Sequence, residues 1–230
     1  MTDIRIYEVG GSIRNELMGL PPSDRDFAVL APSYEAMRNY LLEQGATFYQ
    51  ERPQFVSIKA KLFPFGAVDF TLARKESFYT DGRHPDSVTP AQTIEEDLRR
   101  RDFTMNAMAR EAGDILIIDP FDGQGAITNK VIQTVGCSFE RFQEDRLRIF
   151  RALRFACSLN FEMSYNVESG IRYFGDEDFE SVSPERVQVE LSKMFRANTT
   201  KAITLLSNFP HLLSVMNKKN VWLKATLEQK

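Results

Sequence analysis

The apolar pattern changes near Gly136, and no other feature constrains the fold as strongly. Before Gly136, apolar runs of strand length alternate with turn signals and short helical segments. After it, strand signals stop and helical periodicity continues almost to the last residue. We therefore expect an α+β chain in which a sheet-containing part, residues 1–136, precedes an all-helical part. Within the helical part we separate residues 137–200 from a short final segment, 201–230.

Local signals predict the elements of the first part. Ser12 and Ser33 are expected to cap helices, and a capping box at Thr93 and Glu96 predicts a helix that continues through residues 97–109. The polar segment 74–90 contains glycine and prolines, which predicts a mobile loop. The predicted strands cover residues 4–9, 26–30, 115–118 and a segment near Val131, with residues 55–62 and 67–72 forming a hairpin.

Composition excludes several classes of protein. Two cysteines and two histidines cannot form a Cys/His zinc cluster or a disulfide framework. No apolar stretch approaches the roughly 18 residues of a membrane span, and the charged residues of MTDIRIYEV do not fit a signal peptide. We therefore expect a cytoplasmic protein with no membrane partner. Because histidine and cysteine are scarce, enzyme chemistry would rest on carboxylates and a hard cation. A formal net charge of −3 argues against indiscriminate coating of nucleic acid.

The segment GGSIRNELMGLPPSDRDF contains the first candidate site. Residues two apart in a strand face the same side, so Asp24 and Asp26 should project together and could hold Mg²⁺ for phosphoryl or nucleotidyl transfer. Gly10 and Gly11 let a phosphate approach the backbone, and Arg14 adds positive charge. Each piece alone is more often a solvated or ordinary turn, but their order and spacing together point to a site.

Asp69 is the candidate third carboxylate, in the apolar segment AVDFTLAR. A buried acid needs a partner or a metal, although an acid in this strand could equally face solvent. In EEDLRRRDFTMNAMAR, Asp102 and Asn106 are four apart on the predicted helix and could bind a ribose or orient an arginine, while one or two of Arg99, Arg100 and Arg101 could reach a phosphate. The alternative is a charged helix face above a buried apolar side.

A base-reading pair is predicted in ERFQEDRLRIFRALRFA. Arg141, Asp145 and Arg148 are spaced i, i+4, i+7 on one helical face. A carboxylate accepts and a guanidinium donates, which matches the amino group and ring nitrogen of cytosine or adenine and rejects uracil and guanine. The alternative is a surface ion pair worth a few tenths of a kcal/mol.

These segments together resemble one known family. GGSIR, DRD, RRDFTMNA, DPF-x-G, EDRLRIFRALRF and SPERVQVEL occur in this order over roughly residues 4–196, as in the class II tRNA nucleotidyltransferase and bacterial poly(A) polymerase family. The resemblance implies a polymerase β-like nucleotidyltransferase head with a small mixed sheet, a helical neck, and in 201–230 a short remnant of a body domain. It also implies roles for single residues. Asp24 and Asp26 would bind Mg²⁺, with Asp69 as the third catalytic residue, and the nucleotide would be bound by Gly10, Gly11, Arg14, Arg101, Asp102, Asn106, Asp145, Arg148, Arg151 and Arg154.

The reaction implied by the resemblance is attack of an RNA 3′-hydroxyl on the α-phosphate of CTP or ATP. The chain would add C, A or the whole CCA sequence to tRNA 3′ ends. A poly(A) polymerase, which prefers ATP and extends many RNAs, is the alternative enzyme. A non-catalytic RNA-binding relative is a third possibility, against which the intact Asp24, Asp26, Asp145 and Arg148 argue. The sequence does not specify an oligomeric state.

Overall fold

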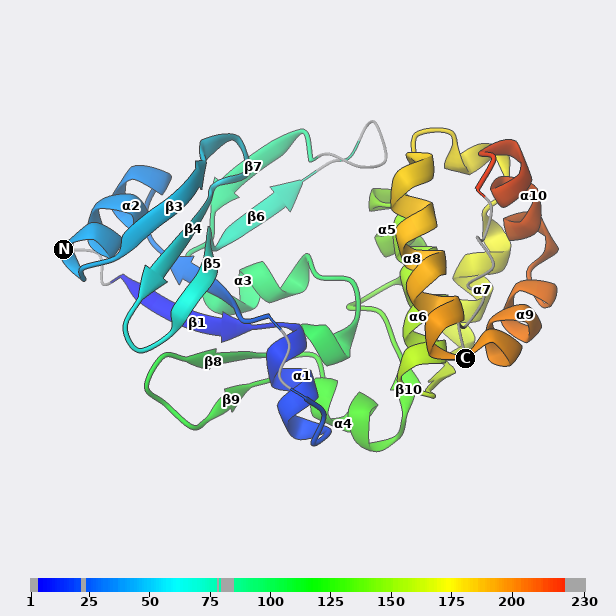
Figure 1. The fold of residues 1–230 in the computed structure, drawn as a ribbon, viewed down its shortest axis with the longest axis horizontal. Helices are drawn as coiled ribbons and strands as arrows, with labels where there is room; N and C mark the ends of the chain where they lie inside the picture. Colours follow the sequence, from blue (N-terminus) through cyan, green and yellow to red (C-terminus); the bar gives the residue numbers. More distant parts are fainter. Residues whose placement is uncertain (1–3, 22–23, 78, 80–84, 222–230) are drawn as a thin grey trace, which may run out of the picture. The chain divides into compact units, whose positions relative to one another are not determined.

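The computed structural model describes residues 4–21, 24–77, 79 and 85–221. These residues belong to two compact units (Figure 1). The first combines the described residues up to Ser77 with Asp86–Asn129, and the second combines Tyr79 and Pro85 with the described residues from Lys130 onward. The main division therefore falls between Asn129 and Lys130, and the functional domain limits at residues 136 and 200 stay predictions.

A mixed sheet forms the centre of the first unit, as predicted. Seven strands lie in the order β3-β4-β5-β2-β1-β8-β9. Strands β2 and β5 are parallel, and the other neighbouring pairs are antiparallel. In chain order the strands are β1 (Arg5–Val9), β2 (Asp26–Leu30), β3 (Thr47–Arg52), β4 (Ser57–Leu62), β5 (Gly66–Leu72), β8 (Ala109–Glu111) and β9 (Ile117–Ile118). Helices outside and after this sheet confirm the α+β class.

The two faces of the sheet differ because side chains alternate along each strand. Phe27 and Val29 of β2 face the same buried core as Phe70 of β5 and Ile58 of β4. Helix α2 (Tyr34–Glu43) adds Met37 and Leu41 to this core, and it begins where predicted, because Ser33 Oγ accepts a hydrogen bond from the Ala36 amide at 3.1 Å. The residues that alternate with these core positions, among them Asp26 and Asp69, belong to the opposite face.

The expectations for the start of the first helix and for the segment 74–90 were wrong in part. Helix α1 (Gly11–Leu17) begins earlier than expected: its N-cap is Gly10 and Ser12 lies inside the helix. Within the predicted mobile loop, β6 (Arg74–Ser77) pairs with β7 (Ser87–Pro90). Pairing gives the backbone N–H and C=O groups of this polar segment hydrogen-bond partners even though it has few apolar side chains. Residues 78 and 80–84 of that loop lie outside the described residues.

The helix predicted through residues 97–109 ends much earlier. Helix α3 covers Ile94–Arg99, and Thr104–Asn106 form a separate 3₁₀ turn, η2. At the start of α3 the Thr93 side chain makes no capping hydrogen bond, whereas Glu96 accepts one from the Gln92 amide at 2.7 Å. The remaining elements of this unit are the 3₁₀ turn η1 (Pro53–Phe55) and helix α4 (Gly123–Thr128).

The second unit is mostly helical. Its elements are β10 (Val131–Ile132), α5 (Ser138–Glu144), α6 (Leu147–Ser158), β11 (Glu162–Met163), α7 (Tyr165–Tyr173), η3 (Glu177–Phe179), α8 (Pro184–Ala197), α9 (Thr199–Ser207) and α10 (Pro210–Lys218). Strand β10 pairs in parallel with β11, so the expectation that strands stop before residue 137 was wrong by one short strand. Among the described residues, no helix is both long and apolar enough to cross a membrane.

Candidate active site

Three carboxylates gather at the start of β2. Asp26 is its first residue, Asp69 is its Cα partner on the parallel strand β5, and Asp24 lies two residues upstream. Desolvation raises the pKa of Asp26, Arg101 opposes this rise, and the charges of Asp69 and Asp24 add to it. Asp69 therefore belongs with the predicted pair and does not lie apart in solvent.

The donor set of this cluster suits a hard divalent cation. A cation would relieve the mutual repulsion of the carboxylates, and Mg²⁺ is commonly held by one or two carboxylates together with substrate phosphates. In the described part of the chain, no group of three His, Cys, Asp or Glu side chains is arranged to hold a metal ion. A cation at these carboxylates would therefore need further oxygen ligands, such as those of a phosphate-bearing substrate.

Gly10 provides a close backbone approach beside these carboxylates. Its φ of +82° lies in a region that favours glycine, and its amide donates to the Met108 carbonyl at 3.3 Å. A Cβ at this position would lie 3.2 Å from Nη1 of Arg101. The positive φ of this turn therefore favours glycine, and a larger residue would also crowd the end of the Arg101 side chain.

A buried hydrogen-bonded chain connects three of the predicted nucleotide-binding residues. Nη1 of Arg14 donates to Oδ1 of Asn106 at 2.6 Å, and Nδ2 of Asn106 donates to Oδ1 of Asp102 at 3.1 Å. Asp102 also accepts from the Phe103 amide at 2.8 Å, and Arg14 donates to Oδ1 of Asn15 at 2.8 Å. The expected proximity of Asp102 and Asn106 is therefore correct, although the intervening backbone is extended at Phe103 and then forms the 3₁₀ turn η2 in place of an α-helix.

Asp97 is a further buried carboxylate, which the sequence patterns did not reveal. Its side chain is fully buried and accepts from Arg100 at 2.8 Å, from Arg101 at 3.0 Å and from the Arg74 amide at 3.1 Å. Burial alone would raise its pKa, but the two guanidinium groups hold the pKa of Asp97 at about 2. The sequence did contain a signal for this contact, because Arg100 and Arg101 follow Asp97 by three and four residues. Glu95 and Glu96, which directly precede Asp97, made it hard to single out one acid of this segment.

A polar cleft of about 310 Å³ lies beside Asp26 in the first unit. Phe55 of η1, Ser57 of β4 and Thr71 of β5 line one part of it. Its cationic lining comes from Arg74, Arg100 and Arg101. The cleft thus joins one of the candidate metal-binding carboxylates to a group of arginines.

The predicted base-reading residues lie in the second unit, at a break between two helices. The prediction of one continuous helical face was wrong, because α5 ends at Glu144 and Asp145 is extended, with φ −150° and ψ 106°. The Asp145 carboxylate accepts from the Leu147 amide at 3.0 Å and from Nη2 of Arg186 at 2.8 Å. Nη1 of Arg148 donates to Glu144 at 2.6 Å.

Helix α8 supplies two residues that the sequence patterns did not single out. Arg186 pairs with Asp145, and the buried Glu190 pairs with Arg154 and lies 3.9 Å from Arg151. Their four-residue spacing places them on one face of α8, which packs against α6. This spacing was the signal available within SPERVQVEL. It follows that Arg151 and Arg154 of the predicted set share one buried carboxylate.

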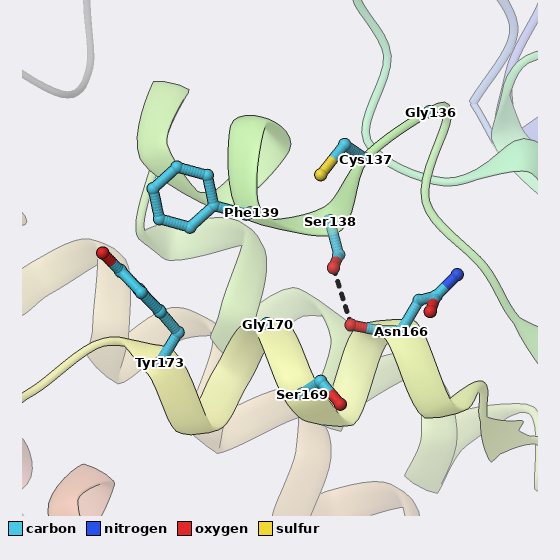
Figure 2. Close-up of a pocket in the computed structure, with 8 residues that line it drawn as sticks. All are labelled: Gly136, Cys137, Ser138, Phe139, Asn166, Ser169, Gly170 and Tyr173. Atoms are coloured by element: carbon cyan, nitrogen blue, oxygen red, sulfur yellow. Dashed lines mark hydrogen bonds between the residues drawn. The ribbon is translucent and has the colours of Figure 1, made fainter.

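A second cavity, of about 730 Å³, belongs to the second unit (Figure 2). It lies between the start of α5 and helix α7, where Ser138 Oγ donates to the Asn166 carbonyl at 2.6 Å. Cys137, Phe139 and Tyr173 also line it. None of the predicted site residues lines this cavity.

Known proteins match most of the chain. The model of the Poly A polymerase head domain matches residues 6–133. The CCA-adding enzyme of Anoxybacillus flavithermus is 37% identical over 225 residues, which cover 95% of this chain and 54% of that enzyme. The crystal structure of the Bacillus stearothermophilus CCA-adding enzyme in complex with CTP is 31% identical, with a TM-score of 0.78 over 94% of this chain and 52% of that one.

A further match is a tRNA nucleotidyltransferase complexed with a primer tRNA and an incoming ATP analog. It is 27% identical, with a TM-score of 0.67 over 93% of this chain and 59% of that one. The chain spans about half the length of the curated relatives it matches. The head-domain match covers more than half of the chain, and the identity to CCA-adding enzymes extends over nearly all of it. The chain therefore belongs to the class II tRNA nucleotidyltransferase and poly(A) polymerase family.

Proposed function

We propose that this chain adds C and A to the 3′ ends of tRNA in the cytoplasm, with CTP and ATP as substrates and Mg²⁺ as cofactor. The observation that carries the proposal is the pairing of Asp26 with Asp69 on neighbouring parallel strands, beside the Gly10 turn. Its relatives include CCA-adding enzymes, one of them bound to CTP.

In this proposal the first unit binds the triphosphate and the reacting groups. Asp24 and Asp26 would hold Mg²⁺, which supplies charge stabilisation to the phosphates when bound. Gly10, Gly11 and Arg14 contact the triphosphate. Most of the lowering of the activation barrier would come from the fixed positions of the protein groups, because phosphoryl transfer needs alignment and electrostatic stabilisation more than a strong base.

In the proposed reaction one bond to the α-phosphorus forms while another breaks. The RNA 3′-oxygen forms a bond to the α-phosphorus while the bond from that phosphorus to the bridging oxygen breaks. Pyrophosphate leaves with the bonding electron pair, and Asp69 accepts the hydroxyl proton. Arg101, Asp102 and Asn106 orient the ribose and phosphates, and the buried chain from Arg14 to Asp102 keeps these groups in place.

The second unit would select the base. The Asp145 carboxylate accepts a hydrogen bond from the exocyclic amino group of cytosine or adenine, and Arg148 donates to the ring nitrogen beside it. Arg151 and Arg154 line the nucleotide pocket. Uracil and guanine present a carbonyl oxygen to Asp145, so both are rejected without a nucleic-acid template.

The test uses tRNA transcripts that end at the discriminator base, at C or at CC. Each is incubated with the protein, Mg²⁺ and one nucleotide at a time, and the products are resolved at single-nucleotide resolution. Ordered addition that stops after CCA supports the proposal. Addition that stops after CC, or that occurs only on transcripts already ending in CC, would restrict the proposed activity to partial CCA addition. Long A tails on unrelated RNA would favour a poly(A) polymerase, the activity for which the matching head-domain family is named. No incorporation on any transcript would overturn the proposal.

A further inference from the structure

We propose that Arg25 is a positioning residue that holds Asp24 and Asp26 in the arrangement needed to bind a divalent cation. This inference rests on the proposed nucleotidyl transfer and concerns the residue between its two proposed metal-binding carboxylates. Arg25 would touch neither the cation nor the substrates. It would act from the other face of the sheet, through the backbone that it shares with its two neighbours.

The Arg25 side chain lies on the opposite side of β2 from Asp26. Cζ of Arg25 is 5.0 Å from the centroid of the Phe27 ring and 5.9 Å from that of the Phe65 ring. Phe27 belongs to the buried core on one face of the sheet, whereas Asp26 belongs to the other face because side chains alternate along a strand. Arg25 is therefore anchored on the core side of the sheet, away from the carboxylates.

Glu8 of β1 fixes the guanidinium of Arg25 with two hydrogen bonds. Nε of Arg25 donates to Oε1 of Glu8 at 3.0 Å, and Nη2 donates to Oε2 at 2.8 Å. Glu8 is buried and is the register partner of Phe27 in the antiparallel pair of β1 and β2. A forked contact of this kind fixes both the distance and the orientation of the guanidinium.

The same glutamate joins this contact to the helix that follows Gly10. Arg110 of β8 is the register partner of Glu8 and donates to it at 3.2 Å. Arg110 also donates to both carboxylate oxygens of Glu16 in α1 at 2.7 Å. Burial alone would raise the pKa of Glu8, but hydrogen bonds from Arg25 and Arg110 lower it below the ordinary value of 4.5. Glu8 is therefore ionised at neutral pH and ties the start of β2 to the elements on both sides of the Gly10 turn.

The two carboxylates need such an anchor because only one of them belongs to a strand. Asp26 is the first residue of β2, while Asp24 lies outside any helix or strand. Pairing with β1 and β5 fixes the backbone from Asp26 onward, and the Arg25 contact extends this order to the segment that joins the two acids. Loss of contacts that hold metal ligands in direction typically lowers metal affinity or activity about 10- to 100-fold.

Positioning and charge predict opposite effects of removing Arg25. A guanidinium next to two carboxylates in the chain repels a divalent metal ion, so its removal would strengthen metal binding if charge alone mattered. If Arg25 holds the two acids in place, its removal weakens metal binding. The sign of the change in metal affinity therefore distinguishes the two roles.

The experiment titrates each protein with Mn²⁺ in the absence of nucleotide and RNA, and measures free Mn²⁺ by electron paramagnetic resonance. Mn²⁺ prefers the same oxygen ligands as Mg²⁺, and Asp26→Asn serves as the blank for Mn²⁺ bound elsewhere. We expect Arg25→Gln to raise the Kd of the Asp26-dependent site about tenfold. Arg25→Lys keeps the charge without the forked contact and should raise this Kd by a smaller factor.

Arg38→Gln is the matched control. Arg38 of α2 also makes a forked pair with a glutamate, since its Nε and Nη2 donate to Glu51 at 2.6 and 3.3 Å. Its guanidinium likewise lies near an aromatic ring, 5.6 Å from the centroid of Phe48. Glu51 and Phe48 belong to β3, which β4 and β5 separate from β2. The Mn²⁺ Kd of Arg38→Gln should therefore stay within about twofold of the wild-type value.

Turnover of a tRNA transcript that ends at the discriminator base tests the same role in the reaction. For Arg25→Gln at low Mg²⁺, kcat should fall about tenfold and should recover as the Mg²⁺ concentration is raised. The KM for the transcript should stay within about twofold. Loss of packing alone would lower the melting temperature without this dependence on metal, as we expect for Arg38→Gln.

The outcomes separate this inference from the proposed function. Unchanged or tighter Mn²⁺ binding by a folded Arg25→Gln protein would overturn the inference and leave the enzyme activity standing. Equal Mn²⁺ binding by wild type and Asp26→Asn would overturn it as well. If wild type binds Mn²⁺ but incorporates no nucleotide, the proposed function fails, and the titration of Arg25→Gln still decides whether Arg25 positions the carboxylates. Thermal unfolding shows whether each variant is folded, and Arg25→Lys carries the test if Arg25→Gln is not.

Discussion

Oδ2 of Asp97 accepts a hydrogen bond from Nη2 of Arg101 at 3.0 Å, and this pair connects helix α3 to the Gly10 turn. Nη1 of the same arginine lies 3.2 Å from the position that a Cβ of Gly10 would occupy. The Asp97 side chain is fully buried, so its charge is compensated by Arg100 and Arg101 and not by water. Asp97 thus sets the direction of a cation that opposes the rise in the pKa of Asp26, which burial causes.

Replacing Asp97 with asparagine should destabilise the protein strongly. Arg100 and Arg101 would lose a buried counter-charge, and removal of one partner of such a pair costs about 3–5 kcal/mol. The pKa of Asp97 is held at about 2, below the ordinary value of 3.8. Its contribution is therefore fully present above pH 4 and is lost as the pH falls from about 4 to 2. Urea unfolding of wild type and Asp97→Asn at pH 7, 4 and 2.5 measures both effects.

The matched control for this measurement is Glu95→Gln in the same first turn of α3. Its expected cost is within about 1 kcal/mol, because it removes only an interaction with the helix dipole. The two variants should differ most at pH 7 and least at pH 2.5. Equal stability of Asp97→Asn and Glu95→Gln at pH 7 would contradict the assigned role of the buried carboxylate.

Replacing Asp26 with asparagine should separate activity from stability. We expect kcat to fall at least about 10³-fold, because several kcal/mol of charge stabilisation would be lost. The free energy of unfolding should rise by up to about 1 kcal/mol, because desolvation and the charges of Asp69 and Asp24 disfavour an ionised Asp26. Single-turnover kinetics and urea unfolding measure the two effects, with the exposed Glu35→Gln in α2 as the control. Full activity of Asp26→Asn would show that the carboxylate assignment is wrong.

The strands of the first unit that coincide with short apolar runs or with partial hydrophobic alternation could be predicted from the sequence. Strands β1 and β2 and the hairpin of β4 and β5 lie within one or two residues of the expected limits. The prediction of a helix through residues 97–109 was wrong, because hydrophobic periodicity carries no information about side chains that compete for backbone hydrogen bonds. The Asp102 carboxylate accepts the Phe103 amide at 2.8 Å, and Phe103 is extended, so a local hydrogen bond replaces the next helical turn.

The same effect explains the break in the second unit. The segment from Arg141 to Arg148 has helical spacing, but Oδ1 of Asp145 accepts the Leu147 amide at 3.0 Å and so begins a new helix. The second hydrogen-bond donor to Asp145, Arg186, is 41 residues away in the sequence, and no local sequence pattern predicts such a pair. Contacts of this kind are set by the packing of α6 against α8, which explains why Arg186 and Glu190 were missed.

The two cysteines should differ sharply in reactivity. Cys137 is exposed, whereas Cys157 is buried in α6, and burial raises the pKa of the Cys157 thiol to about 11. At pH 8 only about 10⁻³ of this thiol is ionised, and thiolate is the reactive form. Ellman's reagent should therefore modify one thiol per chain rapidly in native protein and the second only in urea. Reaction of both thiols at the same rate in native protein would contradict the packing of α6.

Replacing Arg148 with alanine should relax the choice of nucleotide. Under the proposed function this guanidinium reads the ring nitrogen of cytosine or adenine, and a good base contact is worth about 1–3 kcal/mol of discrimination. The ratio of kcat/KM for CTP to that for UTP should fall about 10- to 100-fold. Arg196→Ala, at the exposed end of α8, is the control and should leave the ratio unchanged. An unaltered ratio in Arg148→Ala would contradict base reading by this residue.

Under the proposed function, replacing Arg186 tests whether a residue outside the proposed base-reading pair positions Asp145. Nη1 and Nη2 of Arg186 lie 3.5 and 2.8 Å from the two carboxylate oxygens of Asp145, which is a forked arrangement. Arg186→Gln removes the charge, so we expect the KM for both CTP and ATP to rise about tenfold with kcat less affected. Arg186→Lys keeps the charge without the fork and should recover part of this loss. The kcat and KM values separate positioning from a purely structural role, because loss of packing alone would lower the melting temperature of both variants and leave the KM values unchanged.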